Sequence, residues 1–150
     1  MRIVLQRVSK ASVTIGNQIS GEINKGYLIL LGIESEDNQE DIDWLCNKIS
    51  KMRLFSDNEG KMNLSIQDVD GEILVVSQFT LHANIKKGNR PSFIKAARPE
   101  IAIPLYERFI KAISAHIEKP IQTGEFGAMM DVSLTNDGPV TIIIDSKRKE

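Results

Sequence analysis

The sequence predicts an α+β domain with a mainly antiparallel sheet or partial barrel and two main helices. Segments rich in β-branched residues open and close the chain, two segments have the spacing of amphipathic helices, and an apolar strand lies between those helices. This order of elements is typical of an α+β fold. The chain has the length of one domain, 1–150, and no repeat or linker divides it.

The N-terminal part begins with three predicted strands. Segment 2–15, RIVLQRVSKASVTI, is followed by a short turn and by ISGEI at 19–23, which together predict a hairpin. The apolar run GYLILLGI at 26–33 predicts a third, buried strand. This run is far too short to span a bilayer, so we expect no membrane anchor.

Two amphipathic helices follow. Asn38 and Asp41 have the spacing of a capping box, which predicts a helix of about 14 residues. A second helix precedes Pro120, and its start, near Pro99 or at Pro104, is open because proline fits only the first helical turn. The apolar positions are Ile42, Leu45, Ile49 and Met52 in the first helix, and Ile101, Leu105, Phe109, Ile113 and Ile117 in the second.

A polar loop at 56–63 and a strand at 71–81, GEILVVSQFTL, are predicted between the helices. In a strand, Gln78 and Thr80 face one side while Ser77, Phe79 and Leu81 face the other. Thr80 can act as a nucleophile only with a base, and His82 is the available candidate. No carboxylate is placed to orient that histidine, and a threonine is also common in strands because it is β-branched.

Three closing segments, 121–123, 130–135 and 140–145, have strand character, and the last two flank TNDGPV. Asp-Gly is a strong hairpin signal. The alternative is that Gly138-Pro139 forms a rigid tip aimed at a ligand, because X-Pro bonds adopt the cis form at a cost of only about 0.5–1 kcal/mol. The local sequence does not decide between the two.

The formal net charge is −1, but the charges are unevenly spread. No Asp or Glu occurs from Ile73 through Pro99, and five basic residues fall within thirteen positions of that segment. Such a block either contacts phosphates of a nucleic acid or forms a solvated surface. Its members are Lys86, Lys87, Arg90, Lys95 and Arg98.

Metal and cofactor chemistry have no ligand set in the sequence. Cys46 is the only cysteine, and His82 and His116 are 34 positions apart without a nearby partner. We therefore expect no metal site. Arg2 and Arg7 interrupt the apolar N-terminus, which argues against a secretory signal and for a cytoplasmic protein.

Two separated motifs, SQFTL at 77–81 and NDGPVT at 136–141, resemble the signatures of the D-aminoacyl-tRNA deacylase family. The start MRIVLQRVSKASV and the segments KGNRPSFIKAARPE and TGEFGAMMDVSL are also similar to that family, so the resemblance covers essentially the whole chain. It implies a cytoplasmic homodimer that hydrolyses the ester between a D-amino acid and the 3′ end of tRNA, without metal or cofactor. Glycyl-tRNA is implied as a second substrate, because glycine has no side chain to reject.

The resemblance also implies roles for particular residues. The Gly138-Pro139 bond is expected to be cis and to enter the active site of the other subunit, where it blocks L-amino acids. Arg7 is expected to brace that loop. The residues expected to line the site are Ser77, Gln78, Phe79, Thr80, Ala102 and Met130. Backbone N–H groups near Phe79 and Thr80 are expected to stabilise the oxyanion, and the basic block to contact the tRNA acceptor end.

Two other functions are weighed against this one. A non-catalytic tRNA- or RNA-binding module of the same fold fits the basic block, but it does not explain two intact motifs. A general esterase is disfavoured because the chain has no G-x-S-x-G elbow and no Ser, His and acid set.

Overall fold

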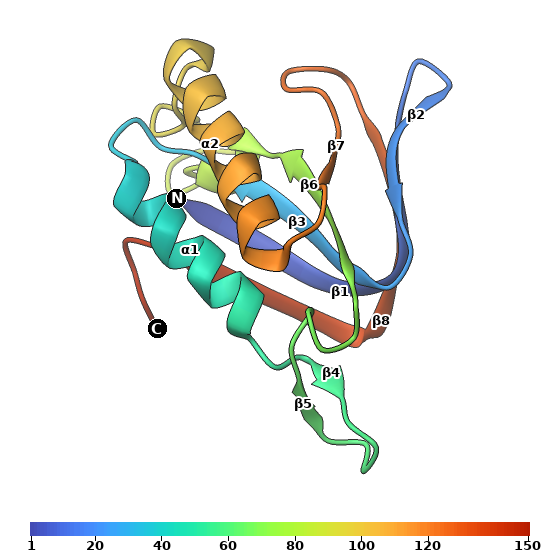
Figure 1. The fold of residues 1–150 in the computed structure, drawn as a ribbon. Helices are drawn as coiled ribbons and strands as arrows, with labels where there is room; N and C mark the ends of the chain where they lie inside the picture. The colour runs from blue at the N-terminus through green and yellow to red at the C-terminus, as the bar shows by residue number, and fades with distance from the viewer.

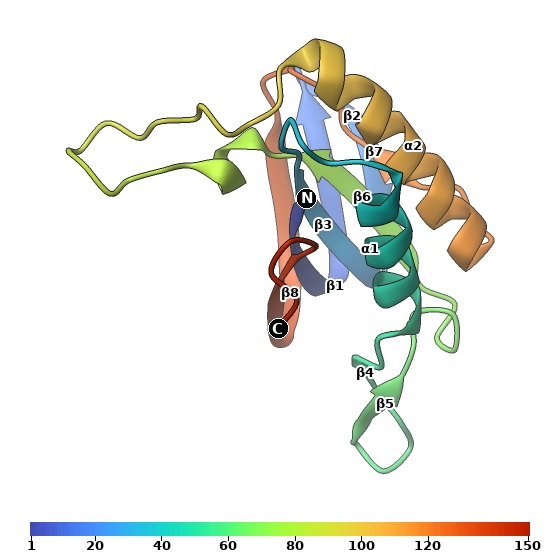
Figure 2. The ribbon, with the colours of Figure 1, turned by 90° about the vertical axis from the view of Figure 1, so that its left-hand side faces the viewer.

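The computed structural model describes all 150 residues and shows a curved mixed sheet with two helices packed on one face (Figures 1 and 2). The strands are β1 (Arg2–Ile15), β2 (Gln18–Ile23), β3 (Gly26–Gly32), β4 (Phe55–Ser56), β5 (Met62–Leu64), β6 (Glu72–Ser77), β7 (Gln122–Thr123) and β8 (Asp131–Asp145). The helices are α1 (Gln39–Lys51), the short 3-10 helix η1 (Phe79–His82) and α2 (Pro99–Ile117). The predicted fold class is confirmed.

β1 organises the sheet, because β8 pairs with it along one edge while β3 and β2 share the other edge. These three pairings are antiparallel, as predicted. The pairings β3–β6 and β6–β7 are parallel, which the sequence did not reveal. Parallel neighbours need long crossover connections, and the segments that contain α1 and α2 supply them.

The main core lies between the sheet and the two helices and contains 22 buried residues. The capping box is present, since Asn38 accepts a hydrogen bond from the Glu40 amide and Asp41 accepts one from the Asn38 amide. Ile42, Leu45 and Ile49 of α1 are buried, as the spacing predicts.

α2 begins at Pro99, which settles the open boundary. Pro99 occupies the first helical turn, where its missing N–H costs nothing. Pro104 lies inside the helix, and the preceding turn is held by the Ala102 amide, which donates to the Arg98 carbonyl at 2.8 Å. Ile101 was expected on the buried face, but it is 43% exposed and Ala102 takes its place in the core.

The predicted strand at 71–81 is too long. It ends at Ser77, and η1 follows. The Gln78 amide makes the last strand-like bond, to the Leu31 carbonyl at 2.8 Å. β3 ends at Gly32, so the chain beyond this point has no neighbouring strand to satisfy its backbone groups and turns instead. The expected alternation of faces through 78–81 is therefore wrong, and Thr80 and His82 do not lie on a common strand face.

Two further expectations need correction. The polar loop predicted at 56–63 is present only at 57–61, because its two ends belong to the paired strands β4 and β5; Asp57 accepts hydrogen bonds from the amides of Glu59 and Lys61 across this loop. The Asp137-Gly138 signal does not form a hairpin, because β8 runs through it as one strand that pairs with β1 on both sides. The hairpin is absent because the segment pairs with the distant strand β1, and the local turn sequence contains no information about that pairing.

The Gly138-Pro139 segment instead forms an irregularity within β8. The register with β1 passes from Val8 opposite Asn136 to Gln6 opposite Thr141, so the residues between do not pair. The Gly138-Pro139 bond is cis, and the Asn136 side chain accepts a hydrogen bond from the Val140 amide at 2.9 Å. No helix of the structure is both long and apolar enough to cross a lipid bilayer.

Candidate active site

An apolar pocket of about 310 Å³ lies at the carboxyl ends of the parallel strands β3 and β6. Strand ends suit a site because the sheet holds them while one side stays open. Its volume is at the lower end of the range for small-ligand sites. The lining residues are Leu31, Ile33, Val76, Ser77, Gln78, Phe79, Ala97, Ala102, Phe126, Gly127, Ala128, Met129, Met130 and Val132.

Five of the residues expected from the sequence meet in this pocket. Ser77 ends β6, Gln78 and Phe79 lead into η1, Ala102 comes from the first turns of α2, and Met130 precedes β8. Phe79 is 56% exposed and packs edge-on against Phe93, with 5.1 Å between ring centroids. A large apolar side chain so exposed at a pocket entrance is a typical ligand contact.

Thr80 does not line the pocket. Its side chain is exposed, and its Oγ1 accepts a hydrogen bond from the Gln78 Nε2. His82 is buried on η1, and the acidic side chain beside it is Glu34 rather than any residue of the pocket. Thr80, His82 and an acid are therefore not arranged as a nucleophile, base and orienting group.

The backbone of η1 has free donors, one in the lining residue Phe79 and one in Thr80, which follows it. The amide N–H groups of Phe79 and Thr80 donate no hydrogen bond within the chain. The first amides of a helical turn have no partner inside that turn. They are suited to hold a negatively charged oxygen.

No titratable side chain lines the pocket; its only polar side chains are those of Ser77 and Gln78. Behind the wall, Tyr106 packs edge-on against Phe126, and burial raises the pKa of its hydroxyl against the opposing effect of a hydrogen bond with Thr123. No group of three or more His, Cys, Asp or Glu side chains lies close enough together to hold a metal ion. The chemistry available here is therefore mainly that of the backbone.

Gly138 and Pro139 are exposed and do not line the pocket of their own chain. They lie at least six residues beyond Val132 along β8, up to about 20 Å for an extended strand. Arg7 is buried and contacts their segment, because its Nε donates to the Asp137 carbonyl at 3.0 Å and its Nη1 to the Leu54 carbonyl. The expected contact between Arg7 and this segment is thus present, while the expected insertion requires a second chain.

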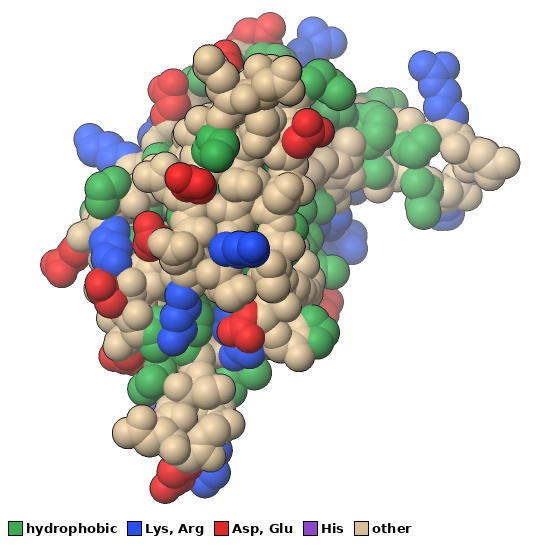
Figure 3. All heavy atoms as spheres, turned by 90° about the vertical axis from the view of Figure 1, so that its right-hand side faces the viewer, with side chains coloured by type: hydrophobic (Ala, Val, Ile, Leu, Met, Phe, Trp, Pro, Cys, Tyr) green, Lys and Arg blue, Asp and Glu red, His purple; other side chains and the backbone are tan.

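The basic block lies on a projecting arm, residues 83–98, which extends from the body of the molecule (Figure 2). The bridge between Asn84 and Ser92 makes the arm a loose hairpin. In Figure 3 it carries basic and apolar side chains together. All five basic side chains are exposed, and none takes part in an ion pair: Lys86, Lys87, Arg90, Lys95 and Arg98.

Sequence reasoning missed part of the pocket. The loop 126–129 forms one wall, and Leu31, Ile33 and Ala97 form another. The run FGAMM carried a usable signal, because its apolar residues surround a glycine in a segment that lacks strand or helix spacing. Two larger hollows, of about 450 and 860 Å³, lie elsewhere on the molecule. We place the site in the smaller apolar pocket, because Phe79 of η1, whose amide is free, lines it.

The fold and the pocket define an α+β protein whose candidate site offers backbone donors in place of charged side chains. A family model described as D-Tyr-tRNA(Tyr) deacylase matches residues 4–145. Curated proteins named D-aminoacyl-tRNA deacylase are similar over the full length of both chains: 62% identical in Flavobacterium johnsoniae and 65% in Bacteroides thetaiotaomicron. The chain belongs to the D-aminoacyl-tRNA deacylase family.

Two solved structures have the same fold. One, described as c-Myc DNA Unwinding Element Binding Protein, has a TM-score of 0.90 and 42% identity, covering 97% of this chain and 98% of that one. The other, a probable eukaryotic D-amino acid tRNA deacylase, has a TM-score of 0.82 with 16% identity, covering 95% and 97%. The second shows the fold alone. The expectation of an enzyme family is confirmed.

Proposed function

We propose that this protein is an enzyme that hydrolyses the ester of D-aminoacyl-tRNA, releasing the D-amino acid and tRNA, in the cytoplasm and through the single domain 1–150. The observation that supports this proposal is the apolar pocket beside η1: it has no titratable side chain, the lining residue Phe79 has a free amide, and so does Thr80, the next residue of η1. Membership of the family supports the reaction class.

Ester hydrolysis develops a negative charge on the carbonyl oxygen, and fixed donors aimed at that oxygen lower the barrier. Removal of one such donor typically costs about 10²–10³-fold in rate. The two η1 amides supply these donors in the proposed mechanism. Because no acid or base side chain lines the pocket, the ribose 2′-hydroxyl of the tRNA helps to activate the attacking water. Ser77 and Gln78 orient the substrate.

The chiral selection needs a second subunit. Gly138-Pro139 lies on the exposed side of β8, away from its own pocket, and it enters the pocket of a partner in the proposed homodimer. The sheet face opposite the helices supports association: Ile142 and Ile144 of β8 pack against the main core, so Ile143 between them faces the other way, and it is 71% exposed. A rigid backbone obstacle rejects L side chains more strongly than differential attraction can. Glycyl-tRNA, without a side chain, is a second substrate.

The alternative is a nucleic-acid-binding module without catalysis. The unpaired basic arm favours it, and the solved relative at 42% identity is described as a DNA-binding protein. This function does not require the pocket.

The deciding experiment is deacylation of D-tyrosyl-tRNA and L-tyrosyl-tRNA by the wild-type protein in the presence of EDTA. We expect rapid loss of the D ester only, unaffected by EDTA. If charged tRNA binds and neither ester is cleaved, the binding module is the better description.

Thr80→Ala is expected to keep D-tyrosyl-tRNA hydrolysis within about tenfold of the wild type, because Thr80 lies outside the pocket and contributes its amide rather than its hydroxyl. Loss of a true nucleophile costs on the order of 10⁶-fold in a well-studied hydrolase. Single-turnover rates distinguish a Thr80 hydroxyl that is dispensable from one that is the nucleophile. Circular dichroism is the control for folding. An inactive but folded Thr80→Ala would make the hydroxyl the nucleophile.

A further inference from the structure

η1 is a turn of four residues whose orientation depends on what holds it. A 3-10 turn this short has weak hydrogen bonds of its own. Its N-terminal end is tied to β3 by the bond from the Gln78 amide to the Leu31 carbonyl at 2.8 Å. Its C-terminal end, Leu81 and His82, makes contacts on the side away from the pocket, and the proposed function uses none of them.

The first of these contacts comes from Arg2 in β1. Its Nη1 donates to the Leu81 carbonyl at 2.7 Å. Asp145 of β8 holds the same guanidinium at 3.0 and 2.9 Å. Although partial burial opposes ionisation of Asp145, hydrogen bonds from the Lys147 amide and from Arg2 keep its pKa below the ordinary value. Arg2 therefore reaches η1 from a fixed position.

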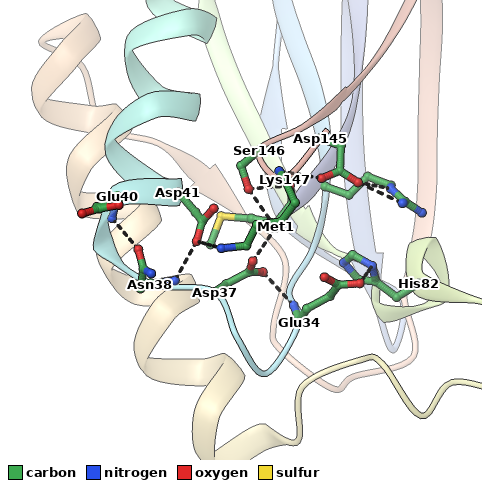
Figure 4. Close-up of polar contacts among 11 residues, drawn as sticks. Met1, Glu34, Asp37, Asn38, Glu40, Asp41, His82, Asp145, Ser146 and Lys147 are labelled. Atoms are coloured by element: carbon green, nitrogen blue, oxygen red, sulfur yellow. Dashed lines mark hydrogen bonds and ion pairs between the residues drawn. The ribbon is translucent and has the colours of Figure 1, made fainter. Parts of the chain in front are cut away.

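The second contact involves His82, which is almost completely buried. Its Nδ1 lies 3.0 Å from the Glu34 Oε1 (Figure 4), although neither ring nitrogen makes a hydrogen bond of good geometry. The ring also packs on Gly32, because a Cβ there would come within 3.1 Å of the His82 Cδ2 and the Gln78 carbonyl. Only a glycine lets β3 approach η1 so closely.

Glu34 is itself held in place. Its amide donates to the Asp37 Oδ2 at 2.7 Å, and the other oxygen of Asp37 pairs with the buried α-ammonium group of Met1 (Figure 4). The Glu34 backbone also bridges to Ala96, next to the pocket residue Ala97. The carboxylate that faces His82 thus belongs to a rigid segment that borders the pocket.

We propose that Arg2 and His82 are positioning residues of the hydrolysis reaction, which fix η1 so that the amides of Phe79 and Thr80 point at the reacting carbonyl. The inference rests on the proposed function. Reacting groups must be held within about 0.5 Å and 10–20° of the productive geometry. A four-residue turn tied at one end does not reach this precision, and the contacts of Leu81 and His82 supply the second tie.

The test uses Arg2→Met and His82→Phe, which remove the two contacts, and Arg2→Lys and Glu34→Gln, which are milder. His116→Phe on α2 is the matched control. We expect kcat on D-tyrosyl-tRNA to fall about tenfold to hundredfold in Arg2→Met and His82→Phe, with KM within about twofold of the wild type. Arg2→Lys keeps a donor and should recover part of kcat. His116→Phe should match the wild type.

A second measurement does not depend on activity: the amide chemical shifts of Phe79 and Thr80 in labelled protein. We expect them to move in Arg2→Met and His82→Phe, and less in Arg2→Lys. Unmoved shifts in every variant, or moved shifts with unchanged kcat, would overturn the inference. If a harsher variant does not fold, Arg2→Lys and Glu34→Gln decide in the same way. A wild-type protein without esterase activity would instead refute the proposed function. The amide chemical shifts would then still show whether the contacts of Arg2 and His82 fix the orientation of η1.

Discussion

Gly138→Ala is expected to lower the rate of D-tyrosyl-tRNA hydrolysis on the order of 10²-fold, the loss typical of a misplacement of about 1 Å at a reacting centre. Gly138 has φ of +135°, a conformation that side chains disfavour. An added Cβ would come within 2.9 Å of the Val140 Cγ2 and 3.0 Å of the Arg7 Nη2. We therefore expect the segment to shift, and with it the obstacle that, in the proposed homodimer, it presents to the partner's pocket.

The matched control is Gly60→Ala in the β4–β5 turn. Gly60 also has a positive φ, but an added Cβ there meets no atom within 4 Å. Its effect should be confined to a small loss of stability. Both rates, on D-tyrosyl-tRNA and L-tyrosyl-tRNA, are measured together with the dimer content by size-exclusion chromatography. A dimeric Gly138→Ala protein with unchanged rates and unchanged discrimination between the D and L esters would show that Gly138-Pro139 is not part of the site.

Neutralising Lys86, Lys87 and Arg90 together to glutamine is expected to weaken tRNA binding by on the order of tenfold or more at low salt. Each phosphate contact contributes about 0.7–0.9 to the slope of log affinity against log salt. Three lost contacts should flatten that slope by about 2–3. These side chains lie on the projecting arm without acidic partners, so their charge is available to a polyanion.

A control of the same composition changes Lys51, Arg108 and Lys111, which are exposed on the outer sides of α1 and α2. It should leave the slope unchanged. Binding is measured by filter retention of uncharged tRNA over a series of salt concentrations. Equal slopes for the arm variant and the wild type would show that the arm is only a solvated surface and does not contact the tRNA phosphates.

Local sequence signals predicted those elements that depend on local chemistry. β1 occupies the residues 2–15 that its β-branched pattern indicated, and α1 begins after Asn38 because the capping box satisfies its first amides. The apolar spacing also located the buried face of α1. The signals were weaker for α2, where Ala102, a small residue, is buried in place of the larger Ile101. Packing against the sheet, which spacing does not report, decides between such neighbours.

The remaining differences come from distant partners. Residues 78–81 were predicted as strand from their sequence, but they do not form one because β3 ends at Gly32 and leaves them no neighbouring strand to pair with. The turn signal at Asp137-Gly138 was overridden because β1 pairs with both halves of β8. For the site, the SQFTL motif led to Ser77, Gln78 and Phe79, while another wall came from loop 126–129, where the apolar residues around a glycine were the only signal in the sequence.

The lining of the pocket has a consequence for how this protein tolerates change. Its donors are peptide groups, and a peptide group is present whatever side chain the residue carries. A scan that replaces each lining residue with alanine would leave those donors in place and would underestimate the site. In the proposed mechanism, function depends on the path of the main chain, so we expect the damaging substitutions to be those that redirect this path: at close approaches such as Gly32, and at contacts such as Arg2 that lie outside the cavity. Residues remote from the substrate can thus vary less freely than some that touch it.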